Sequence, residues 1–278
     1  MRYQRVIFTL LAIITFLTVL PLLFIFVLLL YHSIPVFSFK FIFGYPKEGM
    51  TAGGIFPALV GTLYLSLGTA LFSLPLGIIT AIYLNEYAPK GKISRLIRIA
   101  IVNLAGVPSV VYGLFGLAVF VMFFHFGVSL IAGILTLSVL VLPIVITAAE
   151  EGLRSVPLSF REASLALGAT KWQTIWKIVL PNALPGIATG AILSISRAAG
   201  ETAPILFTCA AFYLPRLPKS PLDEVMALPY HVYVISTQVP DAPLSIQYGA
   251  TLVLLALVFS LNLFAILWRM RIRRAKKW

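Results

Sequence analysis

Long apolar runs separated by short polar segments dominate this chain. A helix that crosses a bilayer needs about 20 mostly apolar residues. Six runs meet that length: Ile7–Leu30, Ala58–Leu84, Ile99–Phe124, Val128–Ala148, Gly186–Thr208 and Tyr248–Trp268. The pattern predicts an all-α, polytopic membrane protein with six transmembrane helices. We expect one membrane domain over residues 1–278, with a first span at about 7–30 and a five-span core at about 58–268.

Composition supports a membrane class. The 278 residues are 60% hydrophobic and only 11% charged, whereas soluble domains carry about 25% charged residues. Arg2 and Arg5 precede a first run that is too long for the core of a signal peptide, and no Ala-x-Ala site follows it. We therefore expect a retained first span. The single cysteine, Cys209, excludes an intrachain disulfide and a cysteine-based metal cluster.

Basic residues are distributed unequally between the two sets of connections. Sixteen lie on one side: Arg2, Arg5, Lys90, Lys92, Arg95, Arg98, Arg154, Arg161, Lys171, Lys177, Arg269, Arg271, Arg273, Arg274, Lys276 and Lys277. Only four, Lys40, Lys47, Arg216 and Lys219, lie on the other. The positive-inside rule predicts that both termini and the loop at about 150–184 are cytoplasmic. The net charge of +12 then reflects orientation and contact with anionic lipid, and we expect no nucleic acid partner.

The predicted cytoplasmic loop contains a short helical segment. Its Ala and Leu residues favour a helix, Gly168 would end it, and Pro181 would break the chain before the fifth span. Such a segment is either a surface connector or a helix that docks on a cytoplasmic partner.

The spacing in this loop resembles the EAA loop of ABC importer permeases. Glu162-Ala163-Ser164 is followed by Gly168 and then by Ile178-Val179-Leu180-Pro181, and only Ser164 departs from the pattern. The resemblance implies a MetI-like type I importer fold and a coupling helix at Glu162–Gly168 that docks on an ATPase. The chain has no Gly-x-x-x-x-Gly-Lys-Ser/Thr loop. We therefore expect a transporter subunit that is not an enzyme and has no cofactor of its own, with ATP and Mg²⁺ bound by partner subunits.

Two charged residues lie inside the fifth predicted span. Arg197 and Glu201 are four residues apart, on one helix face, and Arg197 falls roughly 16 Å from a start at Gly186. Charge at that depth is costly, and a guanidinium fork matches an oxyanion. Ser194 and Thr202 add polarity, and Pro204 would bend the helix. The pair is either the wall of an anion path or a structural ion pair.

The segment Ser196–Pro204 resembles the Arg-Ala-x-Gly-Glu-Thr-Ala-Pro signature of phosphate transporter permeases, and Met226–Tyr233 is similar to the outer loop of their PstA branch. The resemblance implies import of inorganic phosphate through a path that contains Arg197 and Glu201. It also implies a second, PstC-like permease, two PstB-like ATPase subunits and an external PstS-like phosphate-binding protein.

Other interpretations stay open at this level. Sulfate, molybdate or a phosphonate would suit the same arginine, and a membrane scaffold without transport is a further alternative. An intramembrane enzyme is disfavoured because the spans contain no Ser-Lys, Asp-Asp or His-Glu-x-x-His constellation. His32, His125 and His231 do not share a helix face at ligand spacing, so we expect no metal site.

Overall fold

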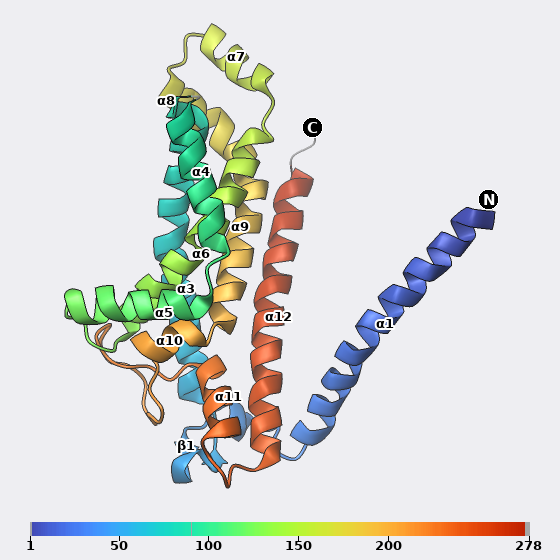
Figure 1. Ribbon diagram of the computed structural model, residues 1–278, viewed down its shortest axis with the longest axis vertical. Helices are drawn as coiled ribbons and strands as arrows, with labels where there is room; N and C mark the ends of the chain where they lie inside the picture. Colours follow the sequence, from blue (N-terminus) through green and yellow to red (C-terminus); the bar gives the residue numbers. More distant parts are fainter. Residues whose placement is uncertain (1, 90, 276–278) are drawn as a thin grey trace. The chain divides into compact units, whose positions relative to one another are not determined.

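The structure is a computed structural model that describes residues 2–89 and 91–275. Lys90, Lys276 and Lys277, three of the basic residues counted above, lie outside the described residues. The chain divides into two compact units, which are described separately: Met1–Phe56 with Val232–Ala256, and Pro57–His231 with Leu257–Trp278. Both are mainly helical (Figure 1).

Five helical segments are long and apolar enough to cross a membrane, and a sharply bent pair provides a sixth. The five segments are Ile7–Ser33, Phe56–Tyr87, Leu130–Arg154, Lys171–Gly200 and Leu244–Arg271. The mainly helical membrane architecture is therefore confirmed, and the count reaches the predicted six spans when the bent pair is taken as one span. The first of these segments, which belongs to α1, is almost entirely exposed within the chain, so its apolar surface has to be covered by lipid or by another subunit.

The helices of both units follow in chain order. They are α1 (Arg2–Ser33), α2 (Phe39–Phe43), α3 (Phe56–Ile82), α4 (Lys92–Ala105), α5 (Ser109–Gly116), α6 (Leu130–Arg154), α7 (Leu158–Ala166), α8 (Lys171–Thr174), α9 (Leu180–Gly200), α10 (Ala203–Thr208), α11 (Leu228–Thr237) and α12 (Leu244–Ala275). Three π-helical turns extend or connect them: η2 (Tyr83–Tyr87), η3 (Leu117–Phe123) and η4 (Ile175–Val179).

The third predicted span is not a straight helix. Where the sequence predicted one span at Ile99–Phe124, α4 and the segment Ser109–Phe123 are bent by 101°. Pro108 explains the bend, because proline has no N–H to donate and disfavours helical geometry at the preceding residue. The hydroxyl of Tyr112 donates to the carbonyl of Leu104 across the bend at 2.7 Å.

The fifth predicted span also differs from the prediction. The helix does not start near Gly186, because it is continuous from Lys171 to Gly200. Pro181 does not break it: the π-helical turn η4 precedes this proline, and the Asn182 side chain donates to the carbonyl of Ile178 at 2.8 Å. The break lies instead at Glu201, whose backbone is extended, before α10 begins with Pro204 in its first turn.

The core of the larger unit lies between α6 and α9. Small residues allow a close approach, since a Cβ built on Gly190 would lie 2.5 Å from the Cβ of Ala148. Small residues serve helix packing in membranes because apolar side chains gain little by leaving lipid. A cluster of buried apolar residues continues this interface: Ala81, Ile82, Ala149, Leu153, Val156, Ile175, Val179, Ala183 and Ile187.

The smaller unit contains a compact segment after α1. Ser38 accepts a hydrogen bond from the backbone N–H of Phe41 and so caps α2. Two short antiparallel strands follow, β1 (Pro46–Lys47) and β2 (Ala52–Gly53), joined by the 3₁₀ turn η1 (Glu48–Met50). Phe41, 1% exposed, lies at the centre of this segment.

Candidate functional site

Arg197 and Glu201 form an ion pair at the broken end of α9. The Nε of Arg197 donates to Oε1 of Glu201 at 3.0 Å, and the two side chains are 36% and 16% exposed. Arg197 lies in the last turn of α9, and Glu201 is the extended residue after it. In the part of the chain that the structure describes, Nη1 and Nη2 of Arg197 have no hydrogen-bond partner, so two nitrogens of the guanidinium fork stay available.

The other predicted path residues take different positions. Thr202 is partly exposed and is the N-cap residue directly before α10. Ser194 is 1% exposed, and its hydroxyl donates to the carbonyl of Ala191 in its own helix. Ser196 instead makes a contact that the sequence did not reveal, since its hydroxyl lies 2.5 Å from Oδ1 of Asn262 in α12. The sequence feature that could have indicated this contact is Asn262 itself, an amide side chain inside the apolar run Tyr248–Trp268.

Two interrupted helices meet beside this pair. A Cβ built on Gly113 in α5 would lie 3.0 Å from the carbonyl oxygen of Ala203 in α10. The short helix after the bend at Pro108 thus packs directly on the short helix after the break at Glu201. Interrupted helices at membrane depth are typical of transporter binding sites, where irregular backbone lines a cavity.

The segment that resembles a coupling helix forms α7, which ends at Ala166, two residues before the predicted limit at Gly168. Gly168 adopts a φ of 82°. Its N–H donates to the carbonyl of Leu165, and the N–H of Ala169 donates to that of Ser164. These two bonds form a Schellman motif, so Gly168 ends the helix as the sequence predicted.

The departure from the EAA pattern has a structural consequence. The hydroxyl of Ser164 lies 2.9 Å from that of Thr174, which alanine at this position would not provide. Thr174 belongs to α8, whose first turn is closed by a capping box between Thr170 and Gln173. Ser164 therefore links α7 to the start of the helical segment Lys171–Gly200, whose last turn carries Arg197.

The surface of α7 and of the turn after it exposes several large apolar side chains. No residue of α7 is buried, Leu167 is 89% exposed and Leu158 is 71% exposed. A hollow of about 410 Å³ adjoins them, lined by Phe160, Ala163, Ser164, Leu167, Ala169, Ile178 and Asn182. Glu162 and Ala163 are also exposed. Exposed apolar surface of this kind is suited to contact with another protein or with a membrane.

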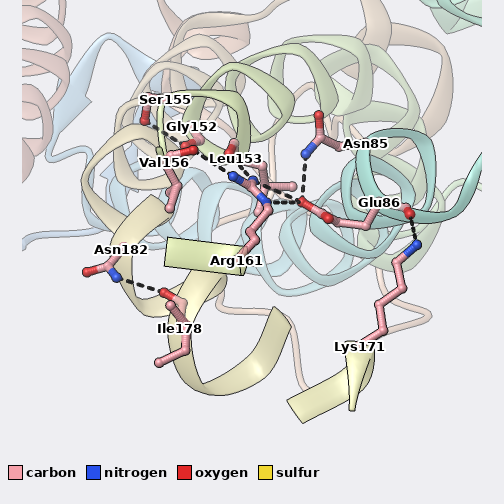
Figure 2. A network of polar contacts seen from close by, with 10 residues as sticks. All are labelled: Asn85, Glu86, Gly152, Leu153, Ser155, Val156, Arg161, Lys171, Ile178 and Asn182. Atoms are coloured by element: carbon pink, nitrogen blue, oxygen red, sulfur yellow. Dashed lines mark hydrogen bonds and ion pairs between the residues drawn. The ribbon is translucent and has the colours of Figure 1, made fainter. Parts of the chain in front are cut away.

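Arg161 joins α7 to the ends of two long helices (Figure 2). Its Nη1 donates to the carbonyl of Val156 at 2.6 Å, and its Nη2 donates to that of Leu153 at 2.8 Å. Its Nη2 and Nε also bond Oε1 of Glu86 at 3.0 and 3.3 Å. The Asn85 amide donates to the same oxygen at 2.8 Å. The Lys171 ammonium donates to the backbone carbonyl of Glu86.

A second charge cluster lies between α4 and α6. Glu150 accepts bonds from Arg98 at 2.7 Å and from Arg154 at 2.6 Å. Arg154 lies four residues after Glu150 on the same helix, whereas Arg98 is distant in sequence. Arg98 also donates to the carbonyl of Leu84 at 2.6 Å.

The histidines and the cysteine do not assemble a site. Among residues 2–89 and 91–275, no group of three or more His, Cys, Asp and Glu side chains is placed to hold a metal ion. Cys209 is fully buried, and burial raises the pKa of its thiol to about 12.

The family of this chain follows from comparison with known proteins. Residues 73–277 match the family model described as "Binding-protein-dependent transport system inner membrane component". The chain is 38% identical over 245 residues to the "Probable ABC transporter permease protein YqgI" of Bacillus subtilis, covering 83% of each protein. It is 40% identical over 226 residues to the "Phosphate transport system permease protein PstA 1" of Mycobacterium tuberculosis strain H37Rv, covering 81% of this chain and 73% of that protein.

Solved structures show the same fold at low sequence identity. A bacterial ABC transporter that imports the polysaccharide alginate matches with a TM-score of 0.65 and 18% identity, covering 94% of this chain and 93% of the solved one. The MetNI methionine transporter matches with a TM-score of 0.63 and 18% identity, covering 77% and 94%. This chain is thus a multi-pass inner membrane protein that belongs to the binding-protein-dependent transport system inner membrane components, and it is an ABC transporter permease subunit and not an enzyme.

Proposed function

We propose that this chain forms part of the translocation path for inorganic phosphate in an ATP-driven importer, with Arg197 as the residue that contacts the anion. The proposal rests on one observation. Nη1 and Nη2 of Arg197 have no hydrogen-bond partner among the described residues, and they lie beside the break between two helices. Relatives of the chain are named phosphate transport system permeases. Those names support phosphate as the cargo, and the guanidinium of Arg197 suits oxyanions in general.

The charge balance of the pair suits a transported anion. Glu201 engages the Nε edge of Arg197, which leaves Nη1 and Nη2 to bond two oxygens of a phosphate. The carboxylate lowers the net positive charge at the site. An anion can therefore bind and leave, as conduction requires.

The proposed assembly has the composition that the family resemblance implies. A second, PstC-like permease would complete the path, two PstB-like ATPases would bind ATP and Mg²⁺, and a PstS-like protein would deliver phosphate from outside. The exposed apolar surface of α7 and Leu167 supports docking of an ATPase. The basic ends of the helices support a cytoplasmic position for α7 and both termini.

The test is uptake of labelled phosphate by vesicles that contain the reconstituted complex. Arg197→Ala should lower uptake at least about tenfold while assembly persists, since a hydrogen bond to a charged group contributes about 1.5–3 kcal/mol. Arg216→Ala is the matched control, because Arg216 also pairs with a carboxylate, Asp223, at 3.5 Å, but lies in the outer loop.

A double variant separates the path from a structural ion pair. If the pair only neutralises buried charge, replacing both Arg197 and Glu201 by alanine should restore uptake. If Arg197 handles the anion, the double variant should stay inactive. Competition by sulfate, molybdate or a phosphonate that equals competition by unlabelled phosphate would contradict the assignment of the cargo.

A further inference from the structure

Polar contacts do much to hold the coupling segment, α7, to the membrane helices. None of the residues of α7 is buried, so apolar contacts fix this helix only weakly. Arg161 in α7 and Lys171 at the start of α8 both contact Glu86, one through its carboxylate and the other through its carbonyl. The two tethers lie on either side of the turn at Gly168.

Glu86 occupies a position from which α3 can be moved. It lies in η2, the π-helical turn that continues α3. Its side chain is 10% exposed and that of Arg161 is 14% exposed, so water screens their interaction little. Lys171 also lies over the ring of Tyr87, with Nζ 4.7 Å from the ring centroid.

Arg161 reaches α6 through a different set of atoms. The carbonyls of Leu153 and Val156 lie at and just after the end of that helix, where the helix dipole is negative and a cation is stabilised. One planar group is therefore bonded to both helix ends at once, and neither end can shift without breaking its bonds to Arg161.

We propose that Arg161 is a positioning residue, and that Arg161 and Glu86 form a joint that makes the cytoplasmic ends of α3 and α6 move together with α7. Figure 2 shows the guanidinium between the two ends. Ser164 makes a separate link to α8, so the helix that carries Arg197 would follow through its own contact. The role in coupling rests on the proposed function, whereas the rigidity of the joint does not.

Distance measurement between spin labels tests the joint without transport. Labels at Ser159→Cys, in α7, and Ile79→Cys, in α3, occupy exposed positions, and the buried Cys209 stays unlabelled. In the assembled complex we expect a narrow distance distribution that ATP does not shift. Glu86→Gln and Arg161→Lys, which keep the size of the side chains, should broaden it. Equal widths in variants and parent, or a parent distance that shifts with ATP, would overturn the joint.

Transport provides the second measurement. In vesicles, both variants should assemble and hydrolyse ATP, with phosphate uptake per ATP lowered about tenfold, a typical size for a lost coupling contact. Asp223→Asn, in the outer-loop ion pair, should leave the ratio unchanged. An unchanged ratio in Glu86→Gln would refute the coupling role. A parent complex that takes up no phosphate would instead contradict the proposed function, while the spin-label result would still decide the joint.

Discussion

Gly152 and Gly186 are in backbone contact where α6 crosses α9: a Cβ built on Gly186 would lie 2.6 Å from the Cα of Gly152. Two backbones held this close leave no space for a methyl group. We expect Gly186→Ala to destabilise the subunit by about 1–3 kcal/mol, as overpacking of a close interface does. Thermal unfolding of the purified complex would measure the loss.

Gly106→Ala is the control for this substitution. A Cβ at Gly106 would meet only the carbonyl oxygen of Asn103, at an ordinary distance of 3.4 Å. It should leave the unfolding temperature almost unchanged. Equal losses in the two variants would show that the α6–α9 crossing is not the close contact described here.

Acid should lower the free energy of unfolding of the subunit through protonation of His231. This side chain is 3% exposed, and burial lowers its pKa to about 4, whereas an unfolded histidine titrates near 6.5. Below pH 6.5 the unfolded state binds a proton that the folded state rejects. Stability should therefore fall as the pH drops from about 6.5 to about 4, by up to about 3 kcal/mol.

Unfolding temperatures at pH 7 and pH 5 would measure this effect. The loss on acidification should be smaller in His231→Phe, which keeps a ring but cannot titrate. His125 is an exposed histidine with a positive φ of 56°. On acidification the His125→Asn variant should lose as much stability as the parent protein does. An undiminished loss in His231→Phe would assign the acid sensitivity to other groups.

Substitution of Gly168 should separate ATP hydrolysis from transport. Apart from its chain neighbours, no described residue has an atom within 4 Å of a Cβ at this position, but its φ is 82°, which a β-branched residue tolerates poorly. Gly168→Val should distort the turn after α7 and lower phosphate uptake per ATP hydrolysed. Gly168→Asn should preserve more of it, because asparagine accepts left-handed geometry. Equal ratios in the two variants would contradict a role for this turn in coupling.

The orientation of the chain can be measured by cysteine labelling. Burial raises the pKa of Cys209 to about 12, so the folded parent should not react with a maleimide. Leu167→Cys, 89% exposed, and Leu222→Cys, 58% exposed, provide reactive positions that the proposed topology places on opposite sides of the membrane. An impermeant maleimide added to intact cells should label Leu222→Cys alone. The reverse result would invert the proposed topology.

The sequence was sufficient to locate the spans but not their shape. Apolar length predicts how many segments can cross a bilayer, because the bilayer thickness is fixed. It does not show that the chain turns by 101° at Pro108 or continues through Pro181. Both prolines lack a backbone N–H, so the sequence predicts a helix break at either position. At Pro181 the preceding π-helical turn allows the helix to continue.

The candidate site was predicted where its members are close in sequence. The Arg197–Glu201 pair and the helix stop at Gly168 both follow from local spacing. Arg161–Glu86 and Ser196–Asn262 join residues 75 and 66 positions apart. The hydropathy pattern does not predict such pairs. It predicts that a charged side chain lies near the end of a span, but not which carbonyl or carboxylate that side chain contacts.

The contacts of Arg98, Arg161 and Lys171 with backbone carbonyls have a consequence for engineering this permease. The positive charges of these residues contribute to the signal that sets the orientation of the chain in the membrane. Each residue also donates a hydrogen bond to a backbone carbonyl at the end of a helix. Moving their charges to the other side to invert the protein would expose bare carbonyls in the same step. An inverted chain should therefore be recovered misfolded. In this permease, substitutions that change the membrane orientation also disturb the fold.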